Sequence, residues 1–116
     1  CVSRDWTQQF EWAVHVPLAR KVGVKAETLE SLAQGRRPEA MAEDEAIAYD
    51  FWEELVRTKG VSDAAYLRAR NRFGETGVVD MLGVIGYFTA VSMVLNVAQT
   101  PPAEDAAVRP LARLPL

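Results

Sequence analysis

Hydrophobic residues recur at helical spacing along the chain, and no segment shows the alternation typical of a β-strand. Asp5 is the expected N-cap of a first helix, with Gln8 reaching back to it as in a capping box. This helix is predicted to run to about Val22 and to be closed by Gly23. Pro17 lies inside it and removes one backbone hydrogen bond, which predicts a kink or a local irregularity.

A short second helix is predicted next, because apolar residues share one stripe and Gly35 follows them. The stripe consists of Ala26, Leu29, Leu32 and Ala33. The segment GRRPE then interrupts the pattern, since Pro38 disfavours helix at the residue before it. We expect a linker there.

Two well-marked helices are predicted between residues 43 and 74. The first begins with acidic residues and ends with Arg57 and Lys59, as the helix dipole favours, and Gly60 is expected to stop it. Its buried stripe consists of Ile47, Phe51 and Leu55, widened by Ala48 and Trp52. Ser62 is the expected cap of the second helix, and Gly74 its expected end. The apolar face of that helix consists of Tyr66, Ala69 and Phe73.

The last predicted helix, from Val78 to Ala98, carries a single charge and is long enough to cross a membrane. Its polar residues and the absence of Lys or Arg clusters at its ends argue against a membrane span. A helix that is apolar on all sides belongs in a core, or in a core shared between subunits. We therefore expect no membrane span, and hydrogen bonds between helices for the polar side chains, which could also line a pocket. These side chains are Tyr87, Thr89, Ser92 and Asn96.

The pattern separates a helical domain, residues 1–99, from a proline-rich tail, residues 100–116. The tail contains four of the six prolines, so we expect it to be extended, a form in which it can lie across a neighbouring subunit. The first residue is not Met, and CVSRDW does not resemble a natural beginning. We therefore expect that upstream sequence is missing.

Composition narrows the class of protein. Hydrophobic residues make up 49% of the 116 residues and charged residues 25%, which is typical of one soluble globular domain. A net charge of -3 argues against binding to nucleic acid. With one cysteine, Cys1, and one histidine, His15, a single chain forms neither a disulfide framework nor a multi-histidine metal site. No secretory leader pattern is present, which favours the cytoplasm.

Candidate chemistry lies in the first helix, where Glu11 and His15 stand four residues apart. Gln8, Leu18 and Val22 share their face, and the apolar end of this face predicts that it is buried. Burying either ionisable group alone costs several kcal/mol, so we expect each to be the partner of the other. Such a pair suits general acid–base catalysis near neutral pH. The alternative is an ordinary pair of helix neighbours with a stabilising role.

The run EWAVHVPLARKVGV resembles the carboxymuconolactone decarboxylase family, whose signature is a Glu, three residues, a His and a small-residue stretch ending in Gly. The resemblance continues through YDFWEELVRTKGVSDAAYLRARNRFGETGVVDMLGVIGYFTAVSMVLN and so covers nearly the whole chain except the tail. It implies an all-α, alkylhydroperoxidase D-like bundle with about five helices in this fragment. It also implies a homo-oligomer, a trimer or a hexamer, with no metal and no organic cofactor. Residues 25–75 add helices that shorter members lack, as in the larger, uncharacterised branch.

The activity implied by this resemblance is that of a carboxy-lyase, which removes CO₂ from an unsaturated lactone acid in aromatic-compound catabolism. His15 is then the expected proton donor to the ring carbon, and Glu11 sets its orientation and charge. Gln8 is expected to bind the small-molecule substrate and Trp12 to wall the pocket. The superfamily also uses a glutamate upstream of the motif, which would fall before Cys1.

Two alternatives stand beside this activity, and the first comes from the same resemblance. The alkylhydroperoxidase D proteins of the wider superfamily carry C-x-x-C-x-x-x-H, and Gln8 and Glu11 stand where their cysteines align. A thiol peroxidase needs an attacking and a resolving thiol, so peroxiredoxin-like antioxidant activity is disfavoured. The other alternative is a non-catalytic oligomeric scaffold in which Glu11 and His15 are a satisfied core pair.

Overall fold

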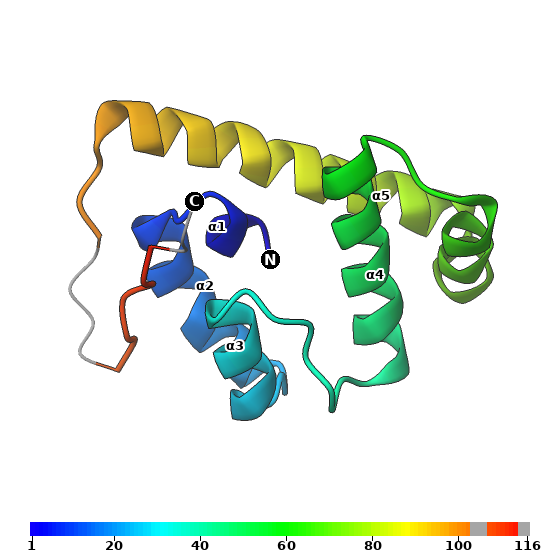
Figure 1. Cartoon of the computed structure of the whole chain (residues 1–116), viewed down its shortest axis with the longest axis horizontal. Helices are drawn as coiled ribbons and strands as arrows, with labels where there is room; N and C mark the ends of the chain where they lie inside the picture. The colour runs from blue at the N-terminus through cyan, green and yellow to red at the C-terminus, as the bar shows by residue number, and fades with distance from the viewer. Residues whose placement is uncertain (103–106, 114–116) are drawn as a thin grey trace. The chain divides into compact units, whose positions relative to one another are not determined.

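The computed structural model describes residues 1–102 and 107–113, and these residues form five α-helices and no strand (Figure 1). The prediction of an all-α fold is thereby confirmed. The chain divides into two compact units, one formed by Cys1–Ala40 with Phe88–Leu116 and the other by Met41–Tyr87. Each unit has its own hydrophobic core.

The first unit begins with two helices where the sequence predicted one: α1, Val2–Asp5, and α2, Gln9–Lys21. Thr7 lies between them with φ +46°, and its N–H donates to the Arg4 carbonyl. Because α1 ends in this left-handed turn, Asp5 belongs to the last turn of α1 and does not cap α2. Gln8 is the N-cap instead, and its side chain accepts the Glu11 N–H.

The helix ends predicted at Gly23 and Gly35 are both confirmed. Gly23 has φ +98°, its N–H donates to the Arg20 carbonyl, and the Val24 N–H donates to the Ala19 carbonyl. Both bonds belong to a Schellman motif, for which glycine is suited. The helix α2 includes Pro17, and α3, Ala26–Ala33, is followed by Gly35 with φ +71°.

Part of the expected tail belongs to the core of the first unit. Buried residues of α2 and α3 pack there with two residues from the C-terminal segment. The members are Trp12, Val16, Leu29, Val108 and Leu111. Gln9 holds this segment in place, because its amide donates to the Leu111 carbonyl at 2.8 Å and accepts the Leu111 N–H at 2.9 Å. Residues 103–106 and 114–116 of the expected tail lie outside the described residues.

The second unit contains α4, Glu43–Thr58, and the first part of α5, Asp63–Ala98. Its core confirms the stripe predicted on α4, with Ile47 and Phe51 buried and Leu55 packed against them. Ala69 and Val78 of α5 complete the buried set. The Ser62 hydroxyl accepts the Ala65 N–H at 3.2 Å, as expected of the cap at the start of α5.

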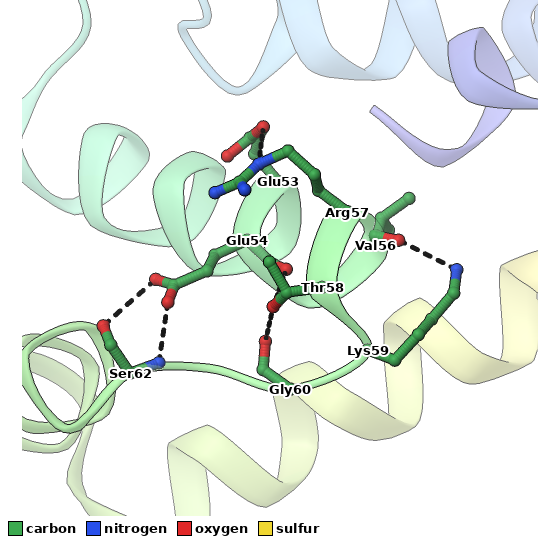
Figure 2. Close-up of polar contacts among 8 residues, drawn as sticks. All are labelled: Glu53, Glu54, Val56, Arg57, Thr58, Lys59, Gly60 and Ser62. Atoms are coloured by element: carbon green, nitrogen blue, oxygen red, sulfur yellow. Dashed lines mark hydrogen bonds and ion pairs between the residues drawn. The ribbon is translucent and has the colours of Figure 1, made fainter.

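The end of α4 differs from the prediction, because Lys59 and not Gly60 adopts the left-handed conformation, with φ +64°. Figure 2 shows what stabilises this turn. The Lys59 ammonium donates to the Val56 carbonyl at 2.8 Å, so the side chain satisfies a carbonyl that the helix end leaves unpaired. Glu54 accepts the Ser62 N–H at 2.7 Å and thereby fixes the chain beyond the turn.

Helix α5 has one non-helical residue, Gly74, with φ +74° and ψ 170°. This region of backbone space is accessible essentially to glycine alone, so the predicted break at Gly74 is confirmed. We call the part of α5 after Gly74, residues 75–98, the apolar arm. Helix α5 has an 18-residue window with mean hydropathy 1.9, of which only 11% is buried, and this window lies in the apolar arm. It is therefore apolar and long enough to cross a membrane, and the described chain leaves most of it uncovered. Its exposed large hydrophobic residues are Val79, Leu82, Val84, Tyr87, Met93, Val94 and Val97.

Candidate functional site between helices α2 and α5

Within the first unit, successive turns of α2 contact successive turns of α5, and the two helices run antiparallel at this contact. The pairs are Gln8 with Asn96, Glu11 with Ser92 and His15 with Phe88. We call these six residues the α2–α5 contact. The hydrogen bonds to Ser92 and Asn96 confirm that polar residues of the last helix join helices to one another.

Glu11 is the acidic residue of this contact, and it is buried, with 3% of its surface exposed. One carboxylate oxygen, Oε2, accepts a hydrogen bond from the hydroxyl of Ser92, which is 0% exposed. The other oxygen, Oε1, has no hydrogen-bond partner among the described residues. An unpaired buried carboxylate oxygen is destabilising, so such a group calls for a functional explanation.

Gln8 is also buried, and both ends of its amide are engaged within the chain. Its Oε1 accepts the Glu11 N–H at 3.0 Å, and its Nε2 donates to the Asn96 Oδ1 at 2.9 Å. Asn96 in turn donates to the Trp6 carbonyl at 3.0 Å. Gln8 therefore shapes the contact, and direct substrate binding by Gln8 would require it to exchange one of these bonds.

His15 does not pair with the Glu11 carboxylate, which corrects the prediction made from their spacing. Its Nδ1 lies 2.8 Å from the backbone carbonyl oxygen of Glu11, while the Glu11 side chain turns to Ser92 on α5. Because a carbonyl only accepts, Nδ1 carries the proton of the neutral ring and Nε2 is left as the acceptor. The ring also meets Phe88 edge to face, with centroids 4.9 Å apart.

The burial predicted for this face of α2 is confirmed at its polar end and wrong at its apolar end. The polar end, Gln8 and Glu11, is buried, whereas Leu18 is 53% and Val22 80% exposed. The two hydrogen bonds and the ring contact described above join α5 to the part of α2 between Gln8 and His15, before its apolar end.

Trp12 lies in the core of the first unit and is 6% exposed. It lines a cavity of about 380 Å³ between α2, α3 and residues 108–112, together with Val16 and Leu29. Neither Glu11 nor His15 lines this cavity. The structure therefore separates Trp12 from the pair whose pocket it was expected to wall.

Arg4 is a buried charge that sequence reasoning missed. It is 3% exposed and donates to the Ala33 carbonyl at 3.0 Å and to the Thr7 hydroxyl at 2.9 Å. Burial lowers the pKa of the Arg4 guanidinium from its usual value, and the charge of Asp5 partly opposes this. Nothing in the surrounding SRDW marks this arginine as buried, because one of its partners, the Ala33 carbonyl, lies 29 residues away in the sequence.

Among residues 1–102 and 107–113, no group of three or more His, Cys, Asp or Glu side chains is placed to hold a metal ion. Cys1 is half-buried and unpaired in a disulfide. The groups that bring acid–base chemistry together in the first unit are thus Glu11, His15 and Ser92.

Comparison of the chain with protein-family models, with curated proteins and with solved structures finds no match.

Proposed function

We propose that the chain is a cofactor-independent enzyme of the carboxymuconolactone decarboxylase type, which removes CO₂ from an unsaturated lactone acid. The observation that carries the proposal is the buried Glu11 carboxylate, which Ser92 binds through one oxygen and whose other oxygen is unpaired. The imidazole of His15 lies one helical turn away. Ionisable groups that are buried and incompletely satisfied are typical of functional sites.

The reaction needs a single proton at the carbon that loses CO₂. When the C–C bond breaks, its electron pair delocalises into the ring and onto the lactone carbonyl oxygen, and a proton then adds to the ring carbon. The Nδ1–H of His15 is held by the Glu11 carbonyl, so Nε2 first takes up a proton from water and, as the imidazolium, then delivers that proton to the ring carbon. The negative charge of Glu11 stabilises the imidazolium that precedes this transfer.

We further propose that the active form is a homo-oligomer, a trimer or a hexamer, in the cytoplasm. The uncovered apolar residues of α5 support this, because large apolar patches on a protein surface mark interaction sites. A second copy suits this arm better than a membrane does. The polar side chains of Thr89, Ser92 and Asn96 would otherwise lie at membrane depth, without Lys or Arg clusters at both ends.

A non-catalytic oligomeric scaffold is the second candidate function. It is favoured by the observation that the cavity beside Trp12 does not include Glu11 or His15. A peroxidase remains the weakest candidate, since Cys1 is the single cysteine of the chain.

Incubation of the purified chain with carboxymuconolactone tests the proposal. We expect one CO₂ released for each lactone consumed, without added metal or cofactor. The Leu18→Ala variant, altered at an exposed residue on the same face of α2, is expected to keep this activity. Absence of CO₂ release by the unaltered protein would overturn the proposed reaction and favour the scaffold.

A further inference from the structure

Ser92 occupies an unusual place in α5. Its neighbours Met93 and Val94 are 46% and 65% exposed, whereas Ser92 itself is 0% exposed. A hydroxyl has one proton to donate, and that of Ser92 goes to Oε2 of Glu11, a residue 81 positions away in the sequence. A buried hydroxyl of this largely exposed, apolar part of α5 is thus directed at the carboxylate of the candidate site.

The bond from Ser92 distinguishes the two oxygens of Glu11. Oε2 is engaged, and Oε1 is buried without a hydrogen-bond partner among the described residues. The main chain of Glu11 is fixed as well, because Gln8 accepts its N–H and is itself bound to Asn96, one turn further along α5. The main chain of Glu11 and one oxygen of its carboxylate are therefore both held by hydrogen bonds.

We propose that Ser92 is a positioning residue, which holds Oε2 of Glu11 so that Oε1 is the oxygen that acts in the reaction. The inference rests on the proposed function, in which Glu11 is the acid–base partner of His15. In that reaction Glu11 stays ionised: Ser92 keeps its own proton and its bond to Oε2, no bond of Glu11 forms or breaks, and the charge on Oε1 stabilises the imidazolium of His15. Charge and protons balance without any further reactant.

A purely structural role makes a different prediction. Asn96 also joins α5 to α2, through Gln8, but it makes no bond to the Glu11 carboxylate. If Ser92 only ties the helices together, then Ser92→Ala and Asn96→Ala affect the Glu11 carboxylate alike. If Ser92 positions the carboxylate, then only Ser92→Ala changes it.

Carbon-13 NMR of the full chain, labelled at the glutamate side-chain carboxyl carbons, separates these roles without any substrate. The Glu11→Gln variant identifies the Glu11 resonance by its loss. We expect the resonance to move in Ser92→Ala, to stay near its original position in Ser92→Thr, and to stay in place in Asn96→Ala even though the melting temperature falls. A resonance that does not move in Ser92→Ala, or that moves equally in Asn96→Ala, would overturn the proposal.

A measurement on the unaltered protein covers the case in which a variant does not fold. Exchange of H₂O for D₂O replaces the Ser92 hydroxyl proton, so the Glu11 carboxyl resonance is expected to show an isotope shift. Absence of that shift counts against the bond and against the proposal.

Kinetics with carboxymuconolactone provide a second test. Loss of a hydrogen bond to a charged group corresponds to about tenfold in rate, so Ser92→Ala is expected to lower kcat about tenfold with KM within about twofold. An unchanged kcat would overturn the positioning role. If the unaltered protein releases no CO₂, the proposed function fails, and the Glu11 resonance alone decides whether Ser92 positions the carboxylate.

Discussion

The imidazole Nδ1 of His15 lies 2.8 Å from the backbone carbonyl oxygen of Glu11, not beside the Glu11 carboxylate. The peptide group of Glu11 therefore orients the ring, and its side chain is free to bind Ser92 on another helix. Glu11 thus has two separate roles in the α2–α5 contact: its peptide group orients His15, and its side chain binds Ser92.

Replacement of His15 by Ala is expected to lower decarboxylation about 10²–10⁴-fold, the usual contribution of a general acid. His15 is only half-buried, so the melting temperature should change little. If His15 and Glu11 act as a unit, the double variant with Glu11→Gln loses little more than the worse single variant. Steady-state kinetics and melting curves for the three variants check this, and full turnover in His15→Ala would contradict it.

Replacement of Glu11 by Met is expected to stabilise the chain by about 1 kcal/mol while turnover is lost. A buried carboxylate with an unpaired oxygen is removed, and the Ser92 hydroxyl can turn to a carbonyl of its own helix. Urea unfolding measures the difference. Glu39→Met, at an exposed position of the same unit, is the control and should stay within about 0.5 kcal/mol. Destabilisation by Glu11→Met would show that the carboxylate is structurally satisfied.

Replacement of Gln9 by Ala removes both hydrogen bonds to the backbone of Leu111. We expect the Leu111 amide to exchange its hydrogen at least about tenfold faster, because each such bond contributes about 1 kcal/mol. Hydrogen exchange followed by NMR checks this at residue level. Gln34→Ala, which removes exposed bonds to the side chains of Glu30 and Arg36, should leave the Leu111 amide protected.

Replacement of both Val94 and Val97 by Glu places two charges on residues that are 65% and 85% exposed in the single chain. We expect a soluble oligomer for the unaltered protein and a smaller species for this variant, because buried charges disrupt an apolar interface. Sedimentation at micromolar concentration measures both. A stable monomer, or partition of the unaltered protein into lipid vesicles, would contradict the shared core.

Two glycines of α5 provide a matched test of the break in this helix. Gly74 has φ +74°, and neither Gly74 nor Gly83 has an atom within 4 Å of an added Cβ. Gly74→Ala is therefore expected to destabilise the chain by about 1–3 kcal/mol through backbone strain alone. Gly83→Ala lies within the regular helix and should stabilise it by about 0.5–1 kcal/mol. Denaturant unfolding measures the free energy of unfolding of both variants. Equal changes would show that a side chain at position 74 causes no backbone strain.

Several parts of the fold were predictable because their causes are local. Gly23, Gly35 and Gly74 take positive φ values where helices end or break, and these values suit residues without a Cβ. The α4 stripe of Ile47 and Phe51 is buried because helical periodicity places both side chains on one face.

Other helix ends were mispredicted where two local solutions compete. Asp5 and Gln8 both offer a cap, and Gln8 caps α2 because a left-handed turn at Thr7 already ends α1. Lys59 and not Gly60 is the left-handed residue, and its ammonium binds the Val56 carbonyl. Small energy differences decide such cases, and spacing does not reveal them.

The sequence by itself determined the helical class, the breaks at glycine and the placement of Glu11 and His15 one turn apart. Only the tertiary structure decided which groups bind them. Ser92 lies 81 residues from Glu11 in the sequence, and chain packing brings its hydroxyl to the carboxylate. The same packing covers the polar end of α2 and leaves Leu18 exposed. Periodicity specifies which side chains share a face, but the partner of that face depends on contacts between distant segments, which local spacing does not encode.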